Sequence, residues 1–156
     1  MNRPKRLIAV PETAAPHAPL RVAKLPQFQP IEIREFSVER TERCAWLARR
    51  AVREALAAWG LLGLLDEVEL MVSEAVTNVF THTAGTGPIT FSLQRVERGV
   101  LVVVDDQDPT PMPAPALPER LDHSGRGVFL ALNQAADYGQ DLQTDGKHLW
   151  AQFAAA

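Results

Sequence analysis

The stretch from Glu69 to His82 constrains this chain most, because its apolar and polar residues recur with the period of a helix. At about 100° per residue, its apolar side chains share one broad arc. On the other side Glu74, Asn78 and His82 follow one another at intervals of four residues. The spacing predicts a helix that buries one face and carries a carboxylate, a carboxamide and an imidazole in a row.

This polar row has two interpretations. It is either the solvent-facing stripe of an ordinary amphipathic helix or part of a site for phosphate chemistry. An Asn side-chain carbonyl can ligate a hard cation such as Mg²⁺ without adding charge. A carboxylate one turn away can accept a proton from a nucleophile that attacks a phosphate. The second interpretation makes Asn78 a metal ligand and Glu74 a general base.

Composition limits the class of protein. The chain has 156 residues, enough for one domain, and its net charge of −3 does not indicate a nucleic-acid or membrane partner. The single Cys44 excludes an intramolecular disulfide and fits a reducing compartment. The apolar run at residues 7–10 is too short for a secretory core or a membrane span. We therefore expect a cytoplasmic protein.

The first 30 residues differ from the rest. They hold six of the twelve prolines and a local charge of +4, without a periodic apolar pattern. Such a segment cannot bury enough apolar surface to offset the entropy lost on ordering. We predict a disordered Pro-rich arm over residues 1–30 and one folded domain over 31–156.

The order of the predicted elements indicates the fold class. Ser37 is expected to cap the first helix and Gly60 to end it. Two pairs of strands follow one another without a helical crossover, which favours an α+β two-layer sandwich: a mixed, mainly antiparallel sheet with helices on one face. The predicted strands are 31–35, 89–94, 100–104, 138–143 and 148–153; the predicted helices are 38–59, the stretch containing 69–82, and 128–136.

Two further groups of residues are candidates for nucleotide contacts. Gly125 and Gly127 precede the third predicted helix, where glycines let backbone N–H groups approach a phosphate, although such a pair also serves as a simple turn. Asp106 follows a buried strand and either forms a turn or accepts from the exocyclic amino group of adenine. Asp105 and Asp108 could take the same role.

Together these stretches, in this order, resemble the GHKL-type ATP-binding proteins, the superfamily of gyrase, MutL and the histidine-kinase catalytic domain. Within it the chain is most similar to the bacterial anti-sigma-factor serine/threonine kinases, over about residues 31–154. The stretch 57–61 resembles the end of the family's first helix, 69–82 the asparagine box, 106–109 the first glycine box, 124–130 the second, and 146–150 the closing strand. The usual Asp-x-Gly-x-Gly of the first box is absent, because Gln, Asp and Pro occupy 107–109.

The resemblance implies the Bergerat (histidine kinase-like ATPase) fold, with ATP and Mg²⁺ as cofactors. It makes Glu74 the general base, Asn78 the Mg²⁺ ligand and Asp106, or its neighbour Asp108, the residue that reads adenine. It also implies that the second glycine box lies against the phosphates. Its contact residues would be Gly125, Arg126, Gly127 and Val128.

The activity implied is ATP-dependent phosphorylation of a serine or threonine on a small antagonist protein, coupled to sequestration of a sigma factor and hence to transcription regulation. The alternative is a nucleotide-dependent binding module that holds partners and transfers no phosphate. A detached histidine-kinase catalytic domain is disfavoured, since the residues upstream leave no room for a phosphoacceptor hairpin. Expected partners are ATP and a sigma factor or antagonist protein, with no direct nucleic acid and no membrane; a homodimer stays open.

Overall fold

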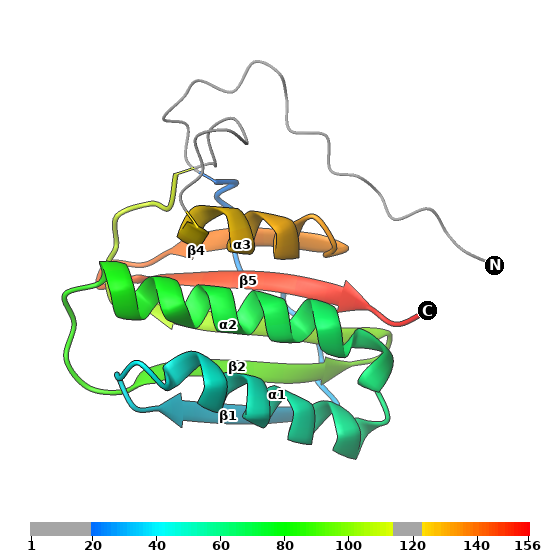
Figure 1. The fold of residues 1–156 in the computed structure, drawn as a ribbon. Helices are drawn as coiled ribbons and strands as arrows, with labels where there is room; N and C mark the ends of the chain where they lie inside the picture. The colour runs from blue at the N-terminus through cyan, green and yellow to red at the C-terminus, as the bar shows by residue number, and fades with distance from the viewer. Residues whose placement is uncertain (1–19, 114–122) are drawn as a thin grey trace.

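A five-stranded antiparallel sheet with helices on one face makes up the fold (Figure 1). The computed structural model describes residues 20–113 and 123–156. The strand order is β1-β2-β3-β5-β4. The strands are β1 (Glu32–Val38), β2 (Ile89–Val96), β3 (Gly99–Asp106), β4 (Asp137–Leu142) and β5 (Lys147–Ala154). The predicted fold class, α+β with helices on one face, is confirmed.

Helix α2 lies between the other two long helices and crosses the middle of the sheet (Figure 1). The helices are α1 (Cys44–Trp59), α2 (Leu65–His82) and α3 (His123–Leu132), with a short 3-10 turn η1 (Leu62–Leu64) between the first two. The predicted apolar arc of α2 is buried from Val68 to Val79. Helix α3 packs beside α2, and of the polar row on α2 Glu74 and Asn78 are only partly exposed, whereas His82 is exposed.

Successive side chains of a strand point to opposite faces of the sheet, and each face carries an apolar cluster. On β3, Val102 and Val104 face the helices, whereas Leu101 and Val103 face the opposite side of the sheet. Trp150 of β5 joins this second cluster and is 2% exposed. The sheet is therefore buried on both faces at its centre.

The first helix begins later than predicted. Ser37 does not cap it, because Ser37 and Val38 belong to β1, where they pair with Thr90 and Ile89 of β2. Val38 is 6% exposed in the main core, so burial and strand pairing outweigh the local capping preference. The predicted stop at Gly60 is confirmed: this residue has a left-handed φ of 69°.

The third helix begins earlier than predicted, at His123 instead of near residue 128. Gly125 and Gly127 therefore lie within α3 and do not precede it. Position 127 has no room for a side chain, because a Cβ atom built on Gly127 would lie 2.1 Å from the carboxyl carbon of Glu74. The helix also ends at Leu132 instead of Ala136, since tight turns lead the chain from there into β4.

Residues 20–25, here called the N-terminal strap, pack against the sheet. Val22 forms a parallel bridge with Gln140 on β4, and the indole N–H of Trp150 donates to the Ala23 carbonyl at 2.9 Å. Leu20 is 5% exposed. Hydrogen bonds therefore hold the strap against the domain although it has no apolar period, and the division of the chain into a disordered arm and a domain at residue 31 stays a prediction. Residues 1–19 of the predicted arm lie outside the described residues.

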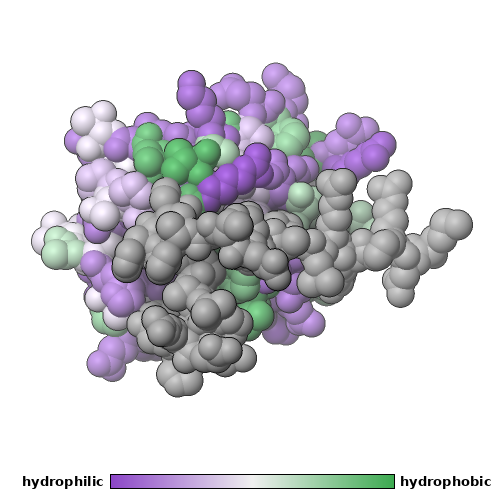
Figure 2. Space-filling model, turned by 90° about the horizontal axis from the view of Figure 1, so that it is seen from above, coloured by the Kyte–Doolittle hydropathy of each residue, from purple (hydrophilic) through white to green (hydrophobic). Residues whose placement is uncertain are grey.

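Figure 2 views the molecule from above, where hydrophilic residues and a smaller group of hydrophobic ones share the described surface. Exposed large apolar side chains of the strap, α3 and β4 are Val22, Leu130 and Leu142. Such scattered residues are normal on a protein surface. Within residues 20–113 and 123–156, none of the helices combines the length and apolarity needed to cross a bilayer.

The strap generates a stability prediction. We expect removal of residues 1–30 to lower the free energy of unfolding by about 2 kcal/mol or more, because it uncovers Trp150 and leaves the buried Gln140 amide without its bond to Leu20. The midpoint of thermal unfolding should fall by about 4–8 °C. A variant lacking only residues 1–19 keeps these contacts and is the control. Equal midpoints for the two truncations would contradict a stabilising strap.

Candidate functional site

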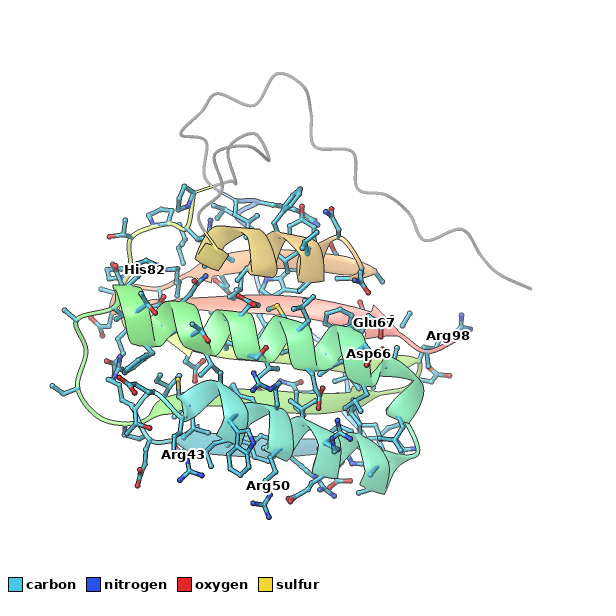
Figure 3. All side chains as sticks on the ribbon, in the orientation of Figure 1. Arg43, Arg50, Asp66, Glu67, His82 and Arg98 are labelled. Atoms are coloured by element: carbon cyan, nitrogen blue, oxygen red, sulfur yellow. The ribbon has the colours of Figure 1, made fainter. Side chains whose placement is uncertain are left out.

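The candidate residues meet where α2 ends and where β3 ends. The hydroxyl of Thr83, the first residue after α2, donates to Oδ1 of Asp106 at 2.7 Å. Asp106 is the last residue of β3. His82, labelled in Figure 3, marks the same end of α2. This hydrogen bond joins the residue that directly follows the stretch 69–82 to the first residue of the stretch 106–109.

Glu74 lies against α3. Its carboxylate is so close to Gly127 that a Cβ atom on that residue would be 2.3 Å from Oε2. Burial raises the pKa of Glu74, and the positive charge of Arg49 opposes this in part. A carboxylate whose charged form is penalised binds a proton more readily than an exposed one, which suits a general base.

Asn78 lies one turn further along the same face. Its side-chain carbonyl oxygen, Oδ1, is buried and has no hydrogen-bond partner among the described residues. Buried polar atoms are almost always paired, so this acceptor requires an explanation, and a cation supplies one. No group of three His, Cys, Asp or Glu residues within the described ranges is arranged to hold a metal. Asn78 therefore fits a Mg²⁺ that takes most of its other ligands from phosphates and water.

Asp106 has an ordered carboxylate on the helix side of the sheet. Its Oδ1 accepts from Thr83 and from the backbone N–H of Asp108 at 2.9 Å. Its Oδ2 lies 3.3 Å from Nζ of Lys147. With a side chain 12% exposed, Asp106 is a preorganised acceptor beside the space that follows α2.

Asp105 lies on the other face, because neighbouring residues of a strand point to opposite sides. Its Oδ2 accepts from the Thr90 hydroxyl at 2.7 Å, and its Oδ1 lies 3.3 Å from Nε2 of His148. It is therefore separated by the sheet from Glu74 and Asn78. The geometry removes Asp105 from the three aspartates considered as readers of adenine.

Asp108 belongs to the loop after β3. Its carboxylate accepts from the backbone N–H of Thr110 at 2.9 Å, which lowers the pKa of Asp108. Its backbone carbonyl accepts from Nζ of Lys147 at 2.7 Å. The side chain of Asp108 is engaged with its own loop. Asp106 is therefore the better placed of the two carboxylates to contact a ligand.

A depression of about 530 Å³ opens beside this loop, lined by residues 82–86 and 107–109. Arg40 crosses its rim: its guanidinium donates to the Gly87 carbonyl at 3.0 Å and to the Gln107 side chain at 3.3 Å. The Arg40 side chain thus contacts both segments that line the depression, through Thr83 and Gln107. The depression is polar and adjoins the Asp106 carboxylate through Thr83 and Asp108.

The second glycine box lies within α3. Val128 is 3% exposed in the hydrophobic core, so only its backbone could reach a phosphate. Because α3 begins at His123, its unbonded N–H groups belong to the first turn, which contains Gly125 and Arg126. The side chain of Arg126 lies outside what the structure describes.

Sequence reasoning missed Lys147 and Thr83. Lys147 was part of a stretch noted only as a closing strand, yet its side chain is 5% exposed and contacts both Asp106 and Asp108. A lysine at the start of a strand gives no sign of burial. Thr83 follows the predicted helix directly. Its role depends on the hydrogen bond to Asp106 at the end of β3, a contact that only the fold creates.

A family profile and several solved structures match this chain. The profile of the histidine kinase-like ATPase domain matches residues 38–153. Among solved structures, the RsbU and RsbW domains of Rv1364c from Mycobacterium tuberculosis are similar in fold, with a TM-score of 0.59 and 15% identity over 80% of this chain. The match spans 32% of that longer chain. Curated proteins gave no match.

The buried Glu74 carboxylate predicts a pH-dependent stability. Its folded-state pKa is raised, so ionisation destabilises the fold above the unfolded-state pKa of about 4.3, and the penalty vanishes below it. We expect Glu74→Gln to raise the thermal midpoint at pH 7 and to leave it unchanged near pH 3. The exposed Glu97→Gln serves as the control and should have little effect at either pH. A Glu74→Gln variant no more stable than the parent at pH 7 would rule out the burial penalty.

Proposed function

The chain belongs to the histidine kinase-like ATPase domain family, and on that premise we propose that it binds ATP with Mg²⁺ and phosphorylates a partner protein as an anti-sigma-factor-type kinase. The observation that carries the proposal is the buried Oδ1 of Asn78, which lacks a hydrogen-bond partner in the described part of the chain and lies one helical turn from Glu74. An orphan acceptor and a partly buried carboxylate on one helix face match what Mg²⁺-dependent phosphoryl transfer requires.

Base recognition is assigned to Asp106. Its carboxylate faces the helix side of the sheet and is oriented by Thr83 and Lys147. A carboxylate only accepts hydrogen bonds, so it favours the exocyclic amino group of adenine and disfavours the carbonyl that guanine has at that position. This supports ATP over GTP as the nucleotide.

Asn78 would hold the metal through Oδ1. A bound Mg²⁺ supplies neutralisation of the phosphate charge during transfer. The side chain donates no charge of its own, so the phosphates keep most of the metal's attraction. The first turn of α3, with Gly125 and Arg126, adds unbonded backbone N–H groups that favour a negatively charged ligand.

Glu74 would act as the general base. In this role its carboxylate would take the proton from the hydroxyl of the acceptor serine or threonine as that oxygen attacks the terminal phosphate, the bond between the β- and γ-phosphates breaks and ADP leaves. Burial raises the pKa of Glu74, which makes it a stronger base than an exposed glutamate. Gly127 keeps the space that the carboxylate occupies.

The partner class is proposed from the family and from the fold neighbour, which contains an RsbW domain. We infer a sigma factor and a small antagonist protein as partners, with the antagonist as the phosphoacceptor. The alternative function is a nucleotide-gated binding module without phosphoryl transfer. The loop Gln107–Pro109, which replaces the glycines of the first glycine box, favours this alternative, because a less flexible loop restricts closure around the nucleotide.

Two substitutions separate kinase from binding module. Asn78→Ala removes the metal ligand, so we expect the Mg²⁺-dependent part of ATP affinity to disappear together with any transfer. Glu74→Gln keeps size and removes the base, so ATP should still bind while transfer falls by about 10²-fold or more. The measurements are calorimetric titration of ATP with and without Mg²⁺, and radiolabelled transfer to a partner co-purified with the chain in the presence of Mg-ATP.

Each outcome decides between the functions. Equal labelling of the partner by the parent and by Glu74→Gln would show that Glu74 is not the base. If the parent binds ATP and changes its affinity for the partner without labelling it, the protein is a nucleotide-gated binding module. A parent that binds no ATP would refute both functions.

The base-reading role of Asp106 has a matched control one residue away. Asp106→Asn replaces half of the acceptor with a donor, so ATP affinity should fall by about one to two orders of magnitude. Asp105→Asn, on the opposite face of the sheet, should leave ATP affinity near that of the parent. GTP should bind poorly to the parent. Equal ATP and GTP affinities in the parent, or a loss confined to Asp105→Asn, would contradict the assignment.

A further inference from the structure

Lys147 is a buried cation. Its side chain is 5% exposed, and its Nζ lies 2.7 Å from the backbone carbonyl of Asp108 and 3.3 Å from Oδ2 of Asp106. Burying an ammonium group is costly unless it is paired and hydrogen-bonded. Core packing alone would be served by an aliphatic side chain, so the charge at this position calls for a role.

The register of the sheet brings this lysine to the end of β3. Lys147 is the cross-strand partner of Asp106 in the antiparallel pair of β3 and β5, so both side chains point toward the helices. Gly146 allows the approach: a Cβ atom on it would lie 2.2 Å from the backbone carbonyl oxygen of Asp106. The turn between β4 and β5 therefore closes directly on the backbone of Asp106, whose carboxylate adjoins the depression through Thr83 and Asp108.

The two oxygens of Asp106 have different partners. A carboxylate offers about four acceptor positions. Two donors, the Thr83 hydroxyl and the Asp108 backbone N–H, bond to Oδ1, whereas the Lys147 ammonium forms an ion pair with Oδ2 at 3.3 Å. These three contacts orient the carboxylate, and Oδ2 remains able to accept an N–H from a ligand.

We propose that Lys147 is a positioning residue for base recognition: it orients the Asp106 carboxylate and holds the Asp108 backbone, so that the pocket reads the exocyclic amino group of adenine. The inference rests on the proposed binding of ATP. Lys147 touches no phosphate in this scheme and acts only through Asp106 and the loop. It also anchors from β5 the loop that has Gln, Asp and Pro where the glycine box has glycines.

The test compares two nucleotides that differ only in the amino group. ATP and purine riboside 5′-triphosphate, which lacks the 6-amino group, are titrated calorimetrically into the full chain with Mg²⁺. The parent should prefer ATP by about ten-fold or more, the contribution of one hydrogen bond to a charged group. Lys147→Met should reduce this ratio to about two-fold or less through weaker ATP binding, with affinity for the second nucleotide within about two-fold of the parent.

Lys24→Met is the matched control, because Lys24 is an exposed lysine of the strap and the substitution removes the same charge. It should keep the parent's ratio. If circular dichroism shows that Lys147→Met does not fold, Lys147→Gln, which keeps a donor without the charge, takes its place under the same criterion.

The outcomes are distinguishable. Equal losses of affinity for both nucleotides would show that Lys147 only supports the fold, and an unchanged ratio would show that it does not act on base recognition; either overturns the inference while ATP binding stands. A parent that binds neither nucleotide would overturn the proposed function and this inference with it. A parent that binds both nucleotides equally would overturn the inference and the role of Asp106.

Discussion

The packing of α2 across the centre of the sheet, between α1 and α3, is the constraint on which the site depends (Figure 1). Its apolar face is buried in the core, whereas Glu74 on its polar face lies against Gly127 of α3. Glu74 is thereby partly desolvated, and the Oδ1 of Asn78 is buried without a hydrogen-bond partner among the described residues. Both features oppose stability, which is typical of groups retained for binding or chemistry.

The register of the sheet determines which aspartate side chains lie on the helix side. Because side chains alternate, Asp105 and Asp106 lie on opposite faces, one with Thr90 and His148 and the other toward the helices. A slip of one residue would exchange them and would carry the β3 valines out of the core. The β3–β5 register places Lys147 beside Asp106, so core packing and the orientation of the carboxylate that we propose for base recognition have one physical origin.

Local sequence determined the features that depend on neighbouring residues. The helical period gave α2 and the common face of Glu74 and Asn78, and a left-handed glycine position gave the end of α1 at Gly60. Hairpin spacing and the absence of helical crossovers gave the antiparallel sheet and the fold class. These features follow from periods of 3.6 and 2 and from backbone sterics, which act within a few residues.

Tertiary structure alone decided the rest. Whether Ser37 caps a helix or extends a strand depends on pairing with β2, more than 50 residues away. The need for a glycine at position 127 depends on the Glu74 carboxylate that fills the space beside it. The position of the strap depends on its hydrogen bonds and bridge to Gln140 of β4. The burial of Lys147 depends on the β3–β5 register. Each is a contact between residues distant in sequence, whose free energy exceeds the local preference and leaves no period by which it could be predicted.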